Sequence, residues 1–169
     1  MVRRFLAAMV LLVAVAGQSL AQTEQDNAVL ALETVLKQIL IGKDTAKFLS
    51  LIGPSGVTFG IDGDNQFKAQ VQEQFDQKRA AYCVLFDSKC LSRETPHKRM
   101  SLPPCSVHDL MSRAKGWTME HQITQNSGVS QVHLILKPDN DYCSNGKDSV
   151  EFVFVEVAEG WQLVGVGYE

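Results

Sequence analysis

The sequence predicts an α+β fold in which N-terminal helices pack on a curved C-terminal antiparallel sheet. Apolar side chains recur every three or four residues over residues 26–42 and again over 65–87, which is the spacing of amphipathic helices. From residue 117 onward, apolar runs are separated by short turn signals, a pattern typical of antiparallel hairpins. Helices and strands that are segregated along the chain favour α+β packing over alternating βαβ units.

The first 21 residues have the features of a secretory signal peptide. A pair of arginines precedes an apolar run, and Ser19 and Ala21 are small residues at the positions that signal peptidase reads. The apolar run is too short for a permanent membrane helix, which needs about 20 residues. We therefore expect residues 1–21 to be removed, leaving residues 22–169 as a single periplasmic or secreted domain without a membrane span.

The helical part of the mature chain comes first. Asp26 or Asn27 can cap the helix over residues 26–42, and Gly42 can end it. The following elements are expected in this order: a short helix over 44–52, a Gly- and Pro-containing break over 53–56, a strand over 57–61, a turn over 62–65 and a long helix over 65–87.

A loop is expected after Cys90, followed by one short helix and four strands. Ser106 and Asp109 have the spacing of a capping pair for that helix, which should end near Gly116. The apolar residues of Val150–Val155 occupy both faces of their strand, so this strand should lie inside the sheet and be covered on both sides. The four strands are expected over residues 117–124, 129–137, 149–157 and 161–168.

In its element order, the chain resembles the NTF2-like superfamily, which includes ketosteroid isomerase and SnoaL-like proteins. The resemblance covers most of residues 26–168 and ends in the hairpin from Phe152 to Val166. Trp161 follows the turn of that hairpin, where the family often places a tryptophan. The irregular insert at residues 88–105 departs from the compact family pattern.

The resemblance implies a cone-shaped fold with a ligand cavity between sheet and helices. Isomerases of the superfamily move a proton with an acidic residue in that cavity. No acidic residue of this chain can be matched to that role. Glu120, Glu151 and Glu156 lie on expected strands, but the sequence does not indicate to which face of the sheet they point. Four aromatic residues are candidates for cavity lining, with an ordinary core role as the alternative: Tyr82, Phe152, Phe154 and Trp161.

All four cysteines lie in the expected mature chain. An even number in an oxidising compartment predicts two disulfides. We favour a bridge between Cys83 and Cys90, which closes a short turn, and one between Cys105 and Cys143, which closes a long loop. Zinc is the alternative, since Cys105-x-x-His108 partly matches a ligand pair, but the usual C-x-x-C knuckles are missing.

The remaining polar residues predict no catalytic, metal or cofactor site. His121 and His133 lie on two strands of one hairpin and could face each other, but no third ligand is evident. Ser55 lies in a Gly-Pro-Ser-Gly loop that is not the nucleophile elbow. The Asp- and Asn-rich runs at 62–65 and 139–141 lack the glycine and distal glutamate of a calcium loop.

Composition narrows the class of partner. The formal net charge is −3, whereas nucleic-acid-binding proteins usually carry an excess of positive charge, so we do not expect a nucleic-acid partner. The basic segment 89–99 is the main local exception, and it could contact an anionic envelope partner or lie solvated. We expect an exported, non-enzymatic binding or protein-interaction domain for an unknown small molecule or envelope protein, with a homodimer through the sheet as a compatible assembly.

Two other functions remain open at this point. One is a small cavity enzyme of the isomerase or dehydratase kind, which would use a buried carboxylate. The other is a periplasmic inhibitor or immunity-type protein, which would block an enzyme with a disulfide-fixed loop at residues 88–105.

Overall fold

The computed structural model divides into two compact units, Met1–Thr34 and Val35–Glu169. The structure describes residues 24–60, 63–94, 105–113, 116–139 and 149–168. In the first unit the described part, residues 24–34, is helical, and this first helix continues to residue 42 in the second unit. The predicted signal peptide, residues 1–21, lies outside the described residues, and the single mature domain stays a prediction.

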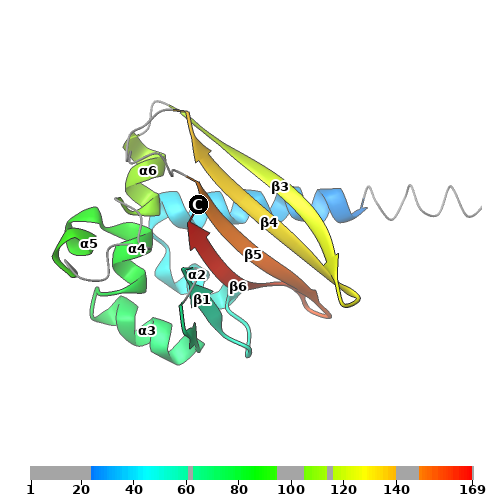
Figure 1. Cartoon of the computed structure of the whole chain (residues 1–169), viewed down its shortest axis with the longest axis horizontal. Helices are drawn as coiled ribbons and strands as arrows, with labels where there is room; N and C mark the ends of the chain where they lie inside the picture. Colours follow the sequence, from blue (N-terminus) through cyan, green and yellow to red (C-terminus); the bar gives the residue numbers. More distant parts are fainter. Residues whose placement is uncertain (1–23, 61–62, 95–104, 114–115, 140–148, 169) are drawn as a thin grey trace, which may run out of the picture. The chain divides into compact units, whose positions relative to one another are not determined.

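The second unit contains five further helices and six strands (Figure 1). None of the helices among the described residues has the length and apolar character needed to cross a membrane. The elements run in the order α2 (Thr45–Leu51), β1 (Val57–Phe59), β2 (Asn65–Gln66), α3 (Lys68–Asp76), α4 (Ala81–Phe86), α5 (Ser88–Glu94), α6 (Val107–Arg113), β3 (Trp117–Asn126), β4 (Val129–Pro138), β5 (Val150–Val157) and β6 (Gly160–Tyr168).

The six strands form one sheet in the order β2-β1-β6-β5-β4-β3. The four C-terminal strands, β3 to β6, pair with one another in antiparallel orientation, as predicted. The sheet as a whole is mixed, because β1 pairs in parallel with β6 through Thr58 and Gly165. The chain passes from β1 through β2 and four helices before it forms β3 to β6, and the last of these strands lies beside β1. The predicted α+β class is therefore confirmed, with a parallel pair added.

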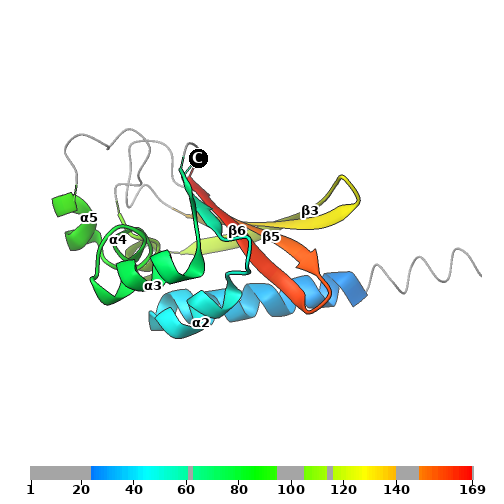
Figure 2. The same cartoon turned by 90° about the horizontal axis from the view of Figure 1, so that it is seen from below.

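Helices cover one face of the curved sheet, which we call the inner face (Figure 2). Lys37 of the first helix lies over the ring of Trp117 on β3, with its Nζ 5.1 Å from the ring centroid. His108 of α6 binds the carbonyl oxygen of Leu40 through Nδ1 at 3.1 Å, which satisfies a carbonyl in the last turn of the first helix. The fully or nearly fully buried side chains of the inner face are Val132, Leu134, Leu136, Val150, Phe152, Phe154, Leu163 and Val166.

The long helix predicted over residues 65–87 is two helices, α3 and α4. The chain turns between them, where Lys78 and Ala80 have φ angles of 49° and 45°. Eleven residues of a straight helix span about 16 Å along its axis, yet the ring centroids of Phe75 and Phe86 lie 5.7 Å apart. The break brings both rings against Phe48, at 5.8 and 6.2 Å, and so completes an aromatic cluster.

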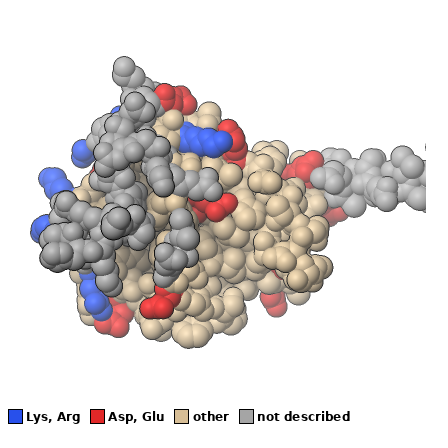
Figure 3. Space-filling model, in the orientation of Figure 1, with Lys and Arg blue, Asp and Glu red and all other residues tan. Residues whose placement is uncertain are grey.

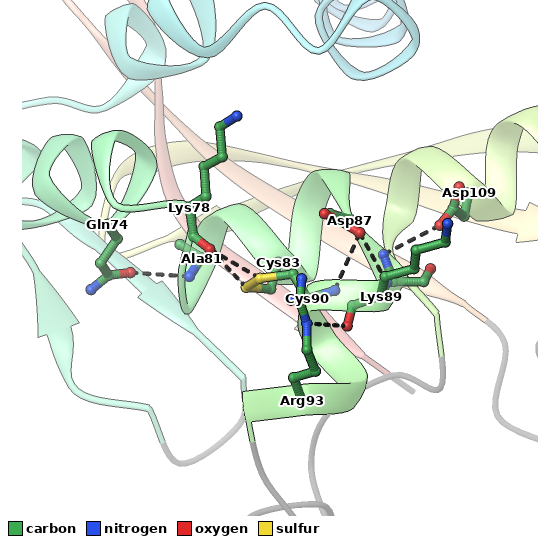
Figure 4. Close-up of a disulfide and its surroundings, with 10 residues drawn as sticks. Gln74, Lys78, Ala81, Cys83, Asp87, Lys89, Cys90, Arg93 and Asp109 are labelled. Atoms are coloured by element: carbon green, nitrogen blue, oxygen red, sulfur yellow. Dashed lines mark hydrogen bonds between the residues drawn. A yellow bond between two sulfur atoms is a disulfide. The ribbon is translucent and has the colours of Figure 1, made fainter.

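The loop predicted after Cys90 is also wrong as far as Glu94, since residues 88–94 form α5. The carboxylate of Asp87 caps this helix. Its Oδ1 accepts hydrogen bonds from the backbone N–H groups of Lys89 and Cys90 at 2.9 and 3.2 Å (Figure 4). These bonds satisfy two of the amides that a helix start leaves unpaired.

A disulfide joins Cys83 of α4 to Cys90 of α5, the first pairing that the sequence favoured. The two Cα atoms lie 5.1 Å apart, within the range that a disulfide spans. Both cysteines are buried, and with Val84 and Leu91 they form a cluster against which Tyr168 of β6 packs. The bridge therefore fixes the two helices where the end of the sheet contacts them.

Of the second predicted disulfide, between Cys105 and Cys143, only Cys105 is among the described residues. Cys105 is disulfide-bonded, and Cys143 lies outside the described residues. None of the described cysteines is free. The zinc alternative for Cys105 and His108 is therefore disfavoured, since a disulfide sulfur is not a thiolate ligand.

Asp109 connects the starts of α5 and α6. Its Oδ2 accepts a hydrogen bond from the backbone N–H of Ser88 at 3.2 Å. Its own N–H donates to Ser106 Oγ at 3.2 Å, which is one half of the predicted Ser106–Asp109 capping pair, whereas the Ser106 N–H donates to Ser88 Oγ at 2.8 Å. Burial raises the pKa of Asp109, but the hydrogen bonds from Ser88 and Ser106 and the charge of Arg113 outweigh burial and leave the pKa below its ordinary value of 3.8.

This lowered pKa predicts an acid-dependent loss of stability. The ionised carboxylate of Asp109 stabilises the folded state above the unfolded pKa, and its contribution is lost as pH falls through the lower folded pKa. Asp109→Asn should therefore lower the free energy of unfolding by about 1–2 kcal/mol near pH 7, with a smaller difference from wild type near pH 2. Urea unfolding of both proteins across this pH range measures the effect. An equal difference at all pH values would contradict it.

Candidate functional site

The four aromatic residues predicted to line a cavity do not gather at one place. Phe152 and Phe154 are fully buried on the inner face of β5. Tyr82 lies among the helices, with its ring 5.6 Å from that of Phe86. Trp161 is half-buried on β6, opposite Glu156 near the hairpin turn. A cavity-lining role for this set stays a prediction.

The strand carboxylates also occupy separate places. Glu120 and Glu151 point to the outer face of the sheet, opposite the helices, as their register with the outward-facing residues of β4 requires. Glu156 is exposed at the end of β5. Among the described residues the fully buried polar side chain is Ser106. The described part of the protein therefore offers no buried carboxylate of the kind that a cavity isomerase uses.

The register of the β3–β4 hairpin separates the two candidate histidines. His121 is opposite Leu134, and His133 is opposite Gln122. Since neighbouring positions of a strand point to opposite faces, His121 lies on the inner face and His133 on the outer face. No group of three metal-ligating side chains occurs among the described residues. The two histidines therefore do not form the beginning of a metal site.

The outer faces of β4 and β5 form the candidate functional site, which we call the open face. The apolar side chains of Ile135, Val153 and Val155 lie at its centre and are half-buried. No described helix covers them, and uncharged residues make up most of the surface drawn over β4 to β6 outside the grey residues (Figure 3). The sequence predicted that β5 would be covered on both faces, and the described residues cover one.

A chain of hydrogen bonds crosses three strands beside this apolar centre. His133 Nδ1 lies 2.8 Å from Glu151 Oε1, and His133 Nε2 lies 3.3 Å from Thr124 Oγ1. Because an ionised carboxylate only accepts hydrogen bonds, Nδ1–H donates to Glu151 and Nε2 meets the hydroxyl of Thr124. The side chains of His133 and Glu151 are 23% and 26% exposed, so a bound molecule can reach them.

The order hydroxyl, imidazole, carboxylate is also that of a nucleophilic triad. Acyl transfer further needs N–H donors aimed at the developing oxyanion. On this face the backbone N–H groups lie in the plane of the sheet and pair with neighbouring strands. The arrangement of Thr124, His133 and Glu151 therefore fits a fixed polar border better than a catalytic centre.

Two glycines of β6 leave that side of the open face without projecting side chains. Gly165 is opposite Val153 and Gly167 is opposite Glu151, so both positions point outward. A Cβ on either glycine would meet its nearest neighbour at an ordinary 3.5 or 3.6 Å. The packing of the chain on itself does not require glycine at these positions. Glycine within a strand often marks the close approach of another backbone.

The inhibitor or immunity-type alternative depends on residues 88–105, of which the structure describes only a part. Of the basic segment 89–99, Lys89 and Arg93 lie on α5, where Arg93 Nε donates to the carbonyl of Lys89 at 3.2 Å. Residues 95–104 lie outside the described residues. A disulfide-fixed inhibitory loop at 88–105 therefore stays a prediction.

Sequence comparison finds no matching family model and no matching curated protein. Solved structures of similar fold are found. One is an NTF2-like protein from Cytophaga hutchinsonii, with 11% identity over 85% of this chain and 96% of that chain and a TM-score of 0.45. Another is ActVI-ORFA from Streptomyces coelicolor, with 13% identity over 86% of this chain and 96% of that chain and a TM-score of 0.46.

A third similar structure is a protein of unknown function with a cystatin-like fold from Nostoc punctiforme. It shows 12% identity over 85% of this chain and 89% of that chain, with a TM-score of 0.44. These NTF2-like and cystatin-like proteins are what the chain is similar to, each with a TM-score below 0.5. At these identities the likeness concerns the fold and carries no ligand, substrate or partner.

Proposed function

We propose that this chain is an exported, non-enzymatic interaction domain that binds an envelope or secreted protein through the open face of its sheet. One observation carries the proposal. The outer side of β5 has apolar residues, Val153 and Val155, as a strand covered on both sides has, and no described element covers that side.

The make-up of the open face supports a protein partner. Protein interfaces have an apolar, desolvated centre and a polar border. Ile135, Val153 and Val155 supply such a centre, and the hydrogen-bonded His133 and Glu151 supply part of the border. Small-molecule sites are concave, whereas this surface is the outer side of a sheet, lowered along β6 by two glycines.

The expected export of the chain is the reason for proposing an envelope or secreted protein as the partner. The predicted signal peptide would deliver the mature chain to an oxidising compartment, and the Cys83–Cys90 disulfide is compatible with that compartment. Mass analysis of the secreted form should show a chain that begins at Gln22. Retention of residues 1–21 would contradict the export part of the proposal and leave the open face as a separate claim.

Site-specific photo-crosslinking tests the binding surface. A benzophenone amino acid at Val155, on the open face, should give one adduct of defined mass with a protein other than this chain when the producing cells are irradiated. The same amino acid at Gln72, an exposed residue of α3, is the matched control and should not give that adduct. The same adduct from both positions, an adduct only with itself, or none from Val155 would contradict the proposal.

A further inference from the structure

Strand β3 forms an edge of the sheet and has one described neighbour. It is ten residues long and is last in the strand order, with β4 on one side. No described strand pairs with its other side, and Figure 1 shows it along the margin of the sheet. An unpaired edge presents a row of N–H and C=O groups that can pair with another strand.

The turn after β3 shows which residues carry those free groups. Ser127 and Gly128 have φ angles of 52° and 81°, as a two-residue type I′ turn requires. Such a turn makes Asn126 and Val129 a hydrogen-bonded pair. The other end of the strand shows the same alternation, because the Asp139 N–H donates to the carbonyl of Gly116, another even-numbered residue, at 2.8 Å. Even-numbered residues of β3 therefore bond to β4, and the odd-numbered residues 117–125 direct N–H and C=O outward.

The features that usually protect an edge strand are missing from β3. Natural sheets use proline, bulges or lysine to prevent edge pairing. β3 contains no proline or lysine, and its register with β4 runs without a shift from Trp117 to Asn126. Its charged side chain, Glu120, is paired within the chain to Lys137 at 2.7 Å. The edge is long, regular and nearly uncharged.

We infer that a second copy of this chain pairs with this edge, antiparallel, across a two-fold axis at His121. This register brings every outward-directed residue of 117–125 opposite another one, so no free N–H or C=O of the segment is left unpaired. It is also self-complementary in its side chains. Half-buried Met119 lies opposite the partner's Ile123, and Thr118 lies opposite the partner's Thr124.

The charges fit the same register. Glu120 lies opposite the partner's Gln122, so no like charges face each other along the contact. The pairing joins two sheets edge to edge and leaves the open face of each copy available. This inference is therefore independent of the proposed function.

Disulfide trapping tests the register. In a hydrogen-bonded antiparallel pair, opposed Cα atoms lie about 5.5 Å apart, which a disulfide can span. His121→Cys in the full chain should form a covalent dimer in an oxidising glutathione buffer. Gln125→Cys is the matched control on the same edge, where the two thiols would be about 27 Å apart, eight residues of strand, and should stay monomeric on non-reducing gels. No dimer from His121→Cys, or equal dimer from both, would overturn the inference.

Charge substitution at Gln122 provides a second, non-covalent test. Gln122→Glu would oppose the partner's Glu120, and Gln122→Lys would attract it. Sedimentation equilibrium should show a weaker dimer for Gln122→Glu and a tighter one for Gln122→Lys, each by roughly two- to thirtyfold because the contact occurs twice per dimer. A wild-type chain that stays monomeric at millimolar concentration, or the same direction of change in both variants, would contradict the pairing.

Discussion

Replacing Phe86 with alanine is expected to lower the free energy of unfolding by about 3–5 kcal/mol. The Phe86 side chain is fully buried. Its ring lies 5.7 Å from that of Phe75, 5.6 Å from that of Tyr82 and 6.2 Å from that of Phe48. Truncation removes the ring on which the other three converge and leaves a cavity where α2, α3 and α4 meet.

Chemical denaturation of Phe86→Ala beside wild type measures this loss. Phe67→Ala is the matched control, since Phe67 is 57% exposed and the same truncation there removes little buried surface. It should change the free energy of unfolding by about 0.5 kcal/mol or less. Equal effects of the two substitutions would contradict the aromatic cluster as the centre of the helical part.

Removing the Cys83–Cys90 disulfide is expected to cost about 2–3 kcal/mol of stability, mainly because the unfolded chain gains freedom. The bridge closes a short loop, with a sequence separation of 7, so its effect falls at the low end for disulfides. The double variant Cys83→Ala and Cys90→Ala keeps both positions apolar in their buried cluster.

Thermal unfolding of the double variant, with thiol alkylation to show that no new free thiol has appeared, measures the effect. The substitution should also loosen the packing of Tyr168, which contacts this cluster. The buried hydroxyl of Tyr168 has no hydrogen-bond partner among the described residues. Burial raises the pKa of that hydroxyl, so Tyr168 stays neutral and tolerates the apolar cluster. A double variant as stable as wild type would show that packing alone fixes α4 and α5.

The strands could be predicted from the sequence because each is marked locally. Apolar alternation identifies β3 to β6, and turn residues separate them, as Ser127 and Gly128 do with positive φ angles. The parallel pairing of β1 with β6 could not be predicted in this way. It joins segments about a hundred residues apart, and the three residues of β1 carry no signal for their partner.

The helix break at residues 77–80 shows why local pattern is insufficient. Lys78 and Ala80 adopt positive φ although neither is glycine, so no residue type marks the turn. Its cause is tertiary, since it brings Phe75 and Phe86 together. The start of α5 did carry a local signal, because Asp87 before Ser88 is a favoured helix cap, but the following basic and polar residues pointed to a loop.

The candidate site depends on strand register, which the sequence leaves open. A shift of one residue moves a side chain to the other face, and that shift separates His121 from His133. Thr124, His133 and Glu151 come from three strands, so their hydrogen bonds could not be predicted without the pairing. The apolar outer side of β5 could be read from Val153 and Val155, and it remains the feature that the described fold does not explain.

Cysteine labelling in the producing cells tests most directly whether a partner covers the open face. Val155→Cys should react with a maleimide in the purified, dilute protein and about tenfold or more slowly in the intact compartment, because the core of an interface excludes solvent. Gln72→Cys should react equally in both. Equal reactivity of Val155→Cys in the two settings would contradict the open face as the binding surface.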